Sequence, residues 1–257
     1  MAMDRRSFVV GALSGAPLAG AAGFAARIAS DRAHARFESR GRLSFSQQGE
    51  DIVLYHVLHD LLQVKAPTYI DIGAADPVQA SNTFLLYWTG GHGVLVEPNP
   101  MYVERLKRER PRDIVVAAGV GVGDATEADY YMIRGKPTLN TFSPEEAARL
   151  RAGAKEDPVE TVVKMPLVSV NRLIATHLGK APDLLSIDVE GLDLDILRTL
   201  DFAGYRPGAI IAETIRMGSR DVNSELVDFV VSHEYVVRGG SMINTVFVDR
   251  KRLETFR

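Results

Sequence analysis

The sequence contains no cysteine among its 257 residues. This absence excludes disulfide bonds, zinc sites built from thiolates and a cysteine nucleophile. It does not assign a compartment, because a cysteine-free chain is safe in oxidising and reducing environments alike.

An excess of positive charge is also missing. The chain has 30 Lys and Arg against 33 Asp and Glu, a formal net charge of −3. Nucleic-acid-binding proteins need a basic surface to neutralise phosphates, so we expect no nucleic-acid partner. The hydrophobic content of 46% and the charged content of 25% are ordinary for a globular protein, and the length suits one large or two small domains.

Long uncharged stretches are missing too, except at the amino-terminal end. The stretch from Ser7 to Ala26 carries no charge and follows Arg5-Arg6. It contains the small-residue site Ala19-Gly20-Ala21, and a second such site, Ala33-His34-Ala35, comes after it. A charged head, a weakly apolar middle and Ala-x-Ala sites are the parts of an export signal. The paired arginines resemble a Tat signal.

We therefore predict that residues 1–35 are a Tat-like signal or an anchor in the inner membrane. The protein is then exported or held at that membrane, and only this segment contacts lipid. The alternative is a disordered tail with a chance Arg-Arg pair, which would leave the protein in the cytoplasm.

Strand-like and helix-like patterns alternate from residue 36 to residue 257, which we interpret as one domain. The main strands are expected at 68–72, 93–96, 114–118, 184–187, 208–213, 235–238 and 245–248. Helices are expected within 46–64 and at 80–88, 101–110, 170–178, 192–200 and 224–232. Two further strands, at 130–133 and 162–168, flank a loop over 134–158.

This alternation predicts an α/β fold, with a mainly parallel sheet and helices on both faces. The last two strands have no helix-length connection between them. They should therefore pair antiparallel, because parallel neighbours need a longer crossover.

Four predicted strands end in or near a carboxylate. These acids are Asp71, Glu97, Asp188 and Glu213. One such acid could cap the following helix, but ligands of open parallel sheets bind beyond the carboxyl ends of the strands. Four acids at one edge therefore predict a shared binding cleft.

The segment from Asp71 to Glu97 has the spacing of a nucleotide-binding unit. An acid at the end of the second strand can bind two ribose hydroxyls, and Gly73 lets the backbone approach a ligand closely. The glycine fingerprint G-x-G-x-x-G is absent, since the turn reads DIGAADP. This disfavours an NAD-using oxidoreductase, which is the second enzyme class we considered.

Several stretches together resemble the FkbM family of methyltransferases, which use S-adenosylmethionine (SAM). The matching stretches are SQQGEDIVL (46–54), YIDIGAADPVQASNTFLL (69–86), GVLVEPNP (93–100) and LLSIDVEGLDLDILRTL (184–200), with weaker matches in TLNTFS (138–143) and INTVFVD (243–249). The resemblance implies a Rossmann-like class I methyltransferase fold with seven strands, the last antiparallel. It also implies O-methylation of a hydroxyl on a sugar, polyketide or similar small metabolite or glycan.

The resemblance further implies which residues bind SAM. The expected cofactor contacts are Ser46, Gln47, Asp71, Gly73, Ala74 and Glu97. One departure from the family pattern is Asp76-Pro77, which stands where family members often carry a glycine. This difference could narrow the turn beside the cofactor.

The catalytic candidates are Asp188 and Glu190, which lie where the acceptor should approach. Asp188 is the first candidate for general base or acceptor-orienting group. Its alternative role is to hold the strand-to-helix turn, and Glu190 could instead bond backbone amides at the helix start. We expect Asp193 and Asp195 to lie in the following helix and to face solvent or its first turn.

A Mg²⁺ ion beside Asp188 and Glu213 is an open alternative, since oxygen ligands suit it. Two carboxylates make an incomplete site, so no metal site is predicted. A non-catalytic exported binding protein with the same fold is the remaining alternative, because SAM is made in the cytoplasm. No feature of the sequence predicts an oligomeric state.

Overall fold

A computed structural model of the chain describes residues 43–189, 191–215 and 221–255. The predicted signal or anchor over 1–35 lies outside the described residues, and so does Glu190. Within the described ranges, no helix has both the length and the apolar character needed to cross a membrane.

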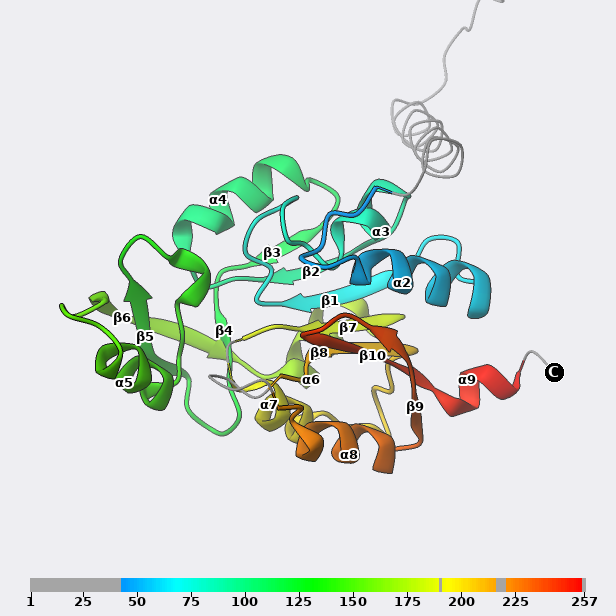
Figure 1. Ribbon diagram of the computed structural model, residues 1–257. Helices are drawn as coiled ribbons and strands as arrows, with labels where there is room; N and C mark the ends of the chain where they lie inside the picture. The colour runs from blue at the N-terminus through cyan, green and yellow to red at the C-terminus, as the bar shows by residue number, and fades with distance from the viewer. Residues whose placement is uncertain (1–42, 190, 216–220, 256–257) are drawn as a thin grey trace, which may run out of the picture.

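A seven-stranded sheet forms the centre of the domain (Figure 1). Its order is β3-β2-β1-β7-β8-β10-β9. Only β10 runs antiparallel to its neighbours. The strands are β1 (Thr68–Ile72), β2 (His92–Val96), β3 (Ile114–Val116), β7 (Leu184–Ile187), β8 (Ala209–Glu213), β9 (Tyr235–Gly240) and β10 (Asn244–Asp249). The predicted sheet is confirmed. The strand order reverses between β1 and β7, where α/β folds open a ligand crevice.

Helices cover both faces of this sheet, as predicted (Figure 1). One face packs against α2 (Glu50–His56), its π-helical continuation η1 (Val57–Leu61), α3 (Phe84–Trp88) and α4 (Pro100–Glu109). The other packs against α6 (Val170–Leu173), its π-helical continuation η3 (Ile174–Leu178), α7 (Asp193–Thr199) and α8 (Ser224–Ser232). Helix α9 (Arg250–Glu254) follows β10.

The two faces of β1 belong to different cores. Ile70 and Ile72 pack with α6, α7 and α8, whereas Tyr69 packs on the side of α2 and α3. Successive side chains of a strand point to opposite faces. Asp71 therefore shares the face of Tyr69, and all five residues of β1 are buried.

A smaller sheet is inserted between β3 and α6. It has the order β4-β6-β5 and consists of β4 (Gly119–Val120), β5 (Glu127–Ile133) and β6 (Val159–Val168). The two extra strands expected at 130–133 and 162–168 therefore pair with each other, outside the main sheet. Figure 1 shows this unit at one end of the domain, with β5, β6 and α5 side by side.

The stretch 134–158, expected to be a loop, contains two helices. They are the 3₁₀ turn η2 (Pro137–Leu139) and the helix α5 (Pro144–Ala152). Ser143 caps α5 by accepting a hydrogen bond from the backbone N–H of Glu146 at 3.1 Å. Serine followed three residues later by glutamate, with proline at the first helical position, is a helix-start signal. The expectation of a plain loop was therefore wrong here.

Helix α3 is shorter than the expected 80–88. Ala80 has a φ of 55°, a left-handed conformation that cannot continue into a helix. The helix begins only at Phe84, whose backbone N–H donates to the Ser81 hydroxyl at 3.2 Å.

Candidate functional site

A cavity of about 590 Å³ lies between the carboxyl edge of the main sheet and the inserted sheet. From the main sheet it is lined by Gly73, Ala75, Glu97 and Asp188, among others. From the inserted unit it is lined by Tyr130, Thr138, Asn140 and Phe142, among others. This volume includes the part of the crevice that opens to solvent.

Gly73 joins the strands around the cavity. Its backbone N–H donates to the carbonyl of Val96 at 3.0 Å, and its φ is 83°. A Cβ atom at this position would lie 1.9 Å from the carbonyl oxygen of Asp188. Only glycine fits both the conformation and this contact, so β1, β2 and β7 meet at one point.

Glu97 lies at one end of the cavity and is 4% exposed. Its Oε2 accepts from the N–H of Ala75 at 3.0 Å, and its Oε1 accepts from the N–H of Asn99 at 2.7 Å. Burial raises the pKa of this carboxyl to about 7, against the lowering effect of the two amides. Each oxygen keeps a lone pair for a further donor such as a ribose hydroxyl.

Asp188 borders the same cavity from the end of β7. Burial raises its pKa to about 6, with smaller contributions from the negative charges of Asp71 and Glu50. Within the described part of the chain, no hydrogen bond to the Asp188 carboxylate accounts for this pKa. The carboxylate is therefore ionised at pH 7 and available to a ligand in the cavity.

Other predicted cofactor residues lie away from the cavity lining. Ser46 donates to Asp51 at 2.8 Å and accepts from the N–H of Gly49 at 3.1 Å, so it shapes the start of α2. Gln47 is exposed. Ala74 packs into the core below α2 and α3. A contact of these residues with SAM stays a prediction.

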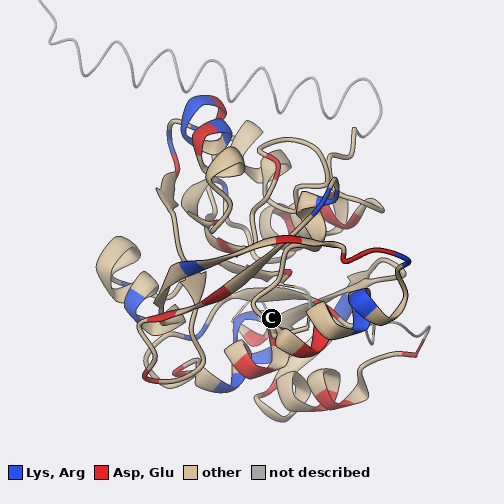
Figure 2. Ribbon diagram, turned by 90° about the vertical axis from the view of Figure 1, so that its left-hand side faces the viewer, with Lys and Arg blue, Asp and Glu red and all other residues tan. Residues whose placement is uncertain are grey.

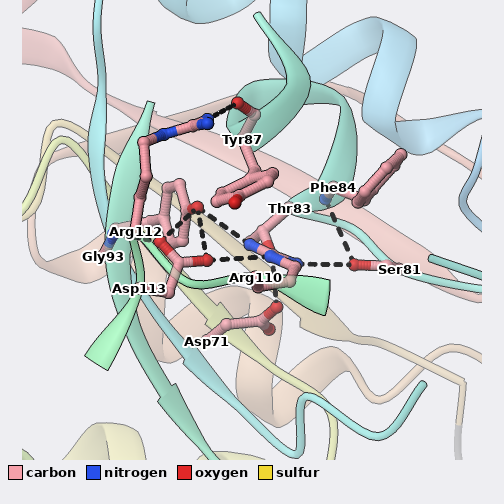
Figure 3. A network of polar contacts seen from close by, with 10 residues as sticks. Asp71, Ser81, Thr83, Phe84, Tyr87, Gly93, Arg110, Arg112 and Asp113 are labelled. Atoms are coloured by element: carbon pink, nitrogen blue, oxygen red, sulfur yellow. Dashed lines mark hydrogen bonds and ion pairs between the residues drawn. The ribbon is translucent and has the colours of Figure 1, made fainter. Parts of the chain in front are cut away.

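Asp71 belongs to a buried polar network behind β1 (Figure 3). Its Oδ2 accepts from the Thr83 hydroxyl at 2.6 Å. Thr83 in turn accepts from Arg110 at 3.1 Å. Asp71 therefore does not border the cavity, although the sequence predicted it as a cofactor contact. It anchors the chain between Gly73 and α3.

Arg110 is the centre of this network and is fully buried. Its Nε donates to Asp113 at 2.8 Å, and a second nitrogen donates to the hydroxyl of Tyr69 at 2.8 Å. The Tyr69 hydroxyl donates to Asp113 at 2.9 Å. Each buried charge is thus paired and hydrogen-bonded, which is the condition for keeping it in a protein core.

Replacement of Arg110 by methionine is expected to lower the free energy of unfolding by about 3 kcal/mol, because it leaves the buried Asp113 carboxylate without its cation. Urea titration measures the loss. The matched control is Arg108→Met, since Arg108 is exposed and its ion pair with Glu109 lies at the surface. Equal stabilities for the two variants would contradict the role given to Arg110.

Asp193 was not predicted to be buried, but it is 4% exposed. It lies in the first turn of α7 and shares a buried face with Ile196 and Leu197. The spacing i, i+3, i+4 could have indicated this burial from the sequence. Asp195 is half-exposed and pairs with Arg198, as expected for a solvent-facing acid.

The described residues of the site form no metal centre. Among residues 43–189, 191–215 and 221–255, no three His, Asp or Glu side chains are arranged to hold an ion. In the ribbon of Figure 2, the segments that contain Lys and Arg are short and separate, with acidic segments among them.

The strand order, the reversed β10 and the cavity at the switch point define a Rossmann-like class I methyltransferase. The family model described as "Methyltransferase FkbM domain" matches residues 71–236. The chain therefore belongs to the FkbM methyltransferase family. No curated protein sequence matches it.

Solved methyltransferase structures resemble the chain at low identity. An FkbM methyltransferase from Methylobacillus flagellatus KT has 14% identity and a TM-score of 0.44, over 71% of this chain and 44% of that one. The chain thus spans less than half of that relative's length. An O-methyltransferase from Bacillus cereus in complex with SAH has 11% identity and a TM-score of 0.39, over 88% and 91% of the two chains. Aeropyrum pernix fibrillarin with natively bound SAM has 11% identity and a TM-score of 0.40, over 77% and 73%.

Proposed function

We propose that the protein transfers a methyl group from SAM to a hydroxyl oxygen of a small metabolite or glycan, such as a sugar or polyketide. The observation that carries this proposal is the placement of two carboxylates around one cavity, with Glu97 at the end of β2 and Asp188 at the end of β7. Glu97 has the position and free lone pairs to accept two ribose hydroxyls. The carboxylate of Asp188 gives the acceptor hydroxyl a negatively charged neighbour.

The residues present fit the cofactor. Gly73 and Ala75 bring backbone close to the cavity, and Tyr130 and Phe142 offer aromatic rings 4.7 Å apart on the opposite wall. Bound SAM supplies an already activated methyl group. The protein must then hold the acceptor in line with it and remove the hydroxyl proton as the oxygen attacks.

Asp188 performs that proton removal in our mechanism. Its pKa of about 6 leaves it ionised at pH 7, and a base with a pKa near the working pH is an effective proton acceptor. The acceptor oxygen would gain the methyl group as the bond between that group and the sulfonium sulfur breaks, and the hydroxyl proton would pass to the Asp188 carboxylate. Glu190 stays a second candidate for the acceptor side.

Asp188→Asn is expected to leave SAM affinity within a few-fold of wild type and to reduce turnover by about 100-fold or more, because the amide cannot accept the proton. Transfer of a labelled methyl group from SAM to a panel of sugars, polyketides and glycans identifies the acceptor and measures turnover. The matched control is Asp195→Asn on the neighbouring helix. Full turnover in Asp188→Asn would show that Asp188 is not the proton acceptor.

The inserted unit is the proposed determinant of acceptor choice. Thr138 and Asn140 line the cavity from the segment 134–158, which is carried on a rigid three-stranded sheet. Variable segments on rigid scaffolds commonly set specificity. Exchange of this segment with that of another family member should change which acceptor in the panel is methylated.

We further propose that residues 1–35 place the domain at the inner membrane. The proposal rests on Arg5-Arg6 and the uncharged stretch after it. An anchor with the domain facing inward keeps it with its cofactor, whereas full export favours the non-catalytic alternative. Protease treatment of intact and lysed spheroplasts distinguishes the two, because only an outward-facing domain is digested in intact cells.

A further inference from the structure

The turn between β1 and α3 carries one of the two donors that hold the Glu97 carboxylate. The N–H of Ala75 in this turn donates to Oε2 at 3.0 Å. The second donor is the N–H of Asn99, which lies at the start of α4 and bonds to Oε1 at 2.7 Å. The orientation of Glu97 therefore depends on how the turn and α4 are held relative to each other.

The turn has a conformation that its own residues disfavour. Ala75 has a φ of 46°, in the left-handed region, where the side chain of alanine crowds the backbone. Glycine avoids this cost, but the stretch that follows Gly73 reads AADPVQA and contains no glycine. Ala75 lines the cavity, and such strained residues persist only where the surrounding contacts fix them.

Asp76 supplies contacts of this kind with both of its carboxylate oxygens. Its Oδ1 accepts from the N–H groups of Val78 at 3.0 Å and Gln79 at 2.9 Å. Its Oδ2 accepts from the guanidinium of Arg105 on α4 at 2.5 Å. The side chain of Asp76 is 17% exposed, so this ion pair is partly shielded from water. Asp76 therefore fixes the shape of the turn and joins the turn to α4.

Together these contacts form a closed ring. The ring runs from Ala75 to Glu97, then through Asn99 into α4, and from Arg105 back to Asp76. Each member is held from two sides, so the turn cannot shift relative to α4 without breaking a contact. The ion pair links α4 to the turn without passing through Glu97.

The ion pair stays charged over the pH range in which Glu97 titrates. Burial raises the pKa of Asp76, but the two backbone N–H groups and Arg105 outweigh this effect and hold it below the usual range. The pKa of Glu97 is about 7. The link between the turn and α4 therefore does not depend on whether Glu97 is protonated.

We propose that Asp76 and Arg105 are positioning residues of the cofactor site. Their ion pair holds Ala75 in its left-handed conformation, so that the Ala75 N–H orients Glu97. The positioning of Glu97 stands on these contacts alone. Its consequence for SAM rests on the proposed function, in which Glu97 accepts the ribose hydroxyls. Arg105 does not line the cavity and acts through the turn.

Amide hydrogen exchange of the full-length protein without ligand tests the positioning directly. Arg105→Met keeps an apolar stem and removes the charge, so the strained turn is free to relax. The Ala75 amide should then exchange at least about tenfold faster than in wild type. The amide of Val103 within α4, which bonds to the carbonyl of Asn99 at 3.0 Å, should keep its rate. Equal rates at Ala75 in the two proteins, or a matching rise at Val103, overturn the proposal.

Calorimetry measures the consequence for the cofactor. If about a tenth of the molecules keep the competent turn, the apparent SAM affinity falls about tenfold. Arg105→Met and Asp76→Asn should each show this loss, while their melting temperatures stay within about 3 °C of wild type. The double variant should lose no more than either single one, because both substitutions remove the same ion pair.

The control for this series is Arg108→Met, since Arg108 is exposed on the same helix and pairs with Glu109. Its SAM affinity should equal that of wild type. Unchanged affinity in Arg105→Met, or losses that add in the double variant, would contradict the positioning role.

Ala75→Gly separates the strain of the turn from any other effect of Arg105. Glycine adopts a φ of 46° without steric cost. In the Arg105→Met background it should therefore recover about threefold or more of the lost SAM affinity. The same substitution in wild type should gain less, because the ion pair already holds the turn. Without any recovery, Arg105 would act by another route and the proposal would be wrong.

The exchange and affinity measurements also separate this proposal from the proposed function. If wild type binds no SAM while Ala75 exchange depends on Arg105, the proposed function fails and the positioning of Glu97 stands. If SAM binds and Arg105→Met changes neither exchange nor affinity, the proposed function stands and the positioning role fails.

Discussion

Glu97→Ala is expected to weaken SAM binding by at least about 100-fold, because two hydrogen bonds from ribose hydroxyls to a buried carboxylate are lost, at about 1.5 kcal/mol or more each. The side chain lies at the sheet edge, 4% exposed. The cap of α4 is supplied separately by Asn99, whose side chain accepts from the N–H of Met101. The fold should therefore survive, and circular dichroism checks that it does.

Calorimetry measures the affinity of this variant against two others. Glu97→Gln keeps the shape of the side chain and loses its charge, so it should fall between wild type and Glu97→Ala. Glu104→Ala is the matched control, since Glu104 lies exposed on α4 and its ion pair among the described residues is with Lys107. If Glu97→Ala bound SAM as tightly as the control, Glu97 would not be a cofactor contact.

Gly73→Ala is expected to lower the free energy of unfolding by about 4 kcal/mol and to abolish SAM binding. The added Cβ would lie 1.9 Å from the carbonyl oxygen of Asp188, which is backbone and cannot rotate away. The φ of 83° adds strain of about 1–2 kcal/mol for any other residue. The clash can be relieved only if β1 and β7 move apart at the edge of the cavity.

Gly123→Ala is the control for that substitution. A Cβ at Gly123 meets no atom within 4 Å, and this glycine does not have a positive φ. Its stability should stay within about 0.5 kcal/mol of wild type. If chemical denaturation gave equal stabilities for the two variants, the close contact between Gly73 and Asp188 would be wrong.

The alternation of strands and helices along the chain could be predicted from the sequence, because short apolar runs alternate with segments of helical spacing. The direction of the Asp71 side chain could not. All residues of β1 are buried, so the strand lacks the polar and apolar alternation that reveals its two faces. The carboxylate consequently seemed to face a ligand, whereas it is bonded to Thr83.

The buried ion pair of Arg110 and Asp113 could not be predicted from the sequence either. Arg110 is the last residue of the mostly charged stretch LKRER (106–110), which is typical of a solvent-facing helix end. Its partners Tyr69 and Thr83 lie 41 and 27 residues away along the chain. Contacts at that separation depend on tertiary packing, which residue spacing alone does not specify.

The positions of Glu97 and Asp188 at the sheet edge could be inferred from the sequence, while their roles stay predictions. Each follows a strand of the parallel sheet, and the carboxyl ends of parallel strands meet at one edge. Both line the cavity. The burial of Asp193 was not predicted, although its spacing from Ile196 and Leu197 indicates that the three residues share one face of α7.

Calorimetric titration of the full-length protein with SAM at pH 6, 7 and 8 tests the account most directly. Glu97 has a pKa of about 7 before ligand binds, and only its ionised form accepts both ribose hydroxyls. We predict one site per chain and an affinity that rises about tenfold from pH 6 to pH 8, with that rise absent in Glu97→Gln. No binding of SAM at any pH, or the same pH dependence in both proteins, would contradict the proposed cofactor site.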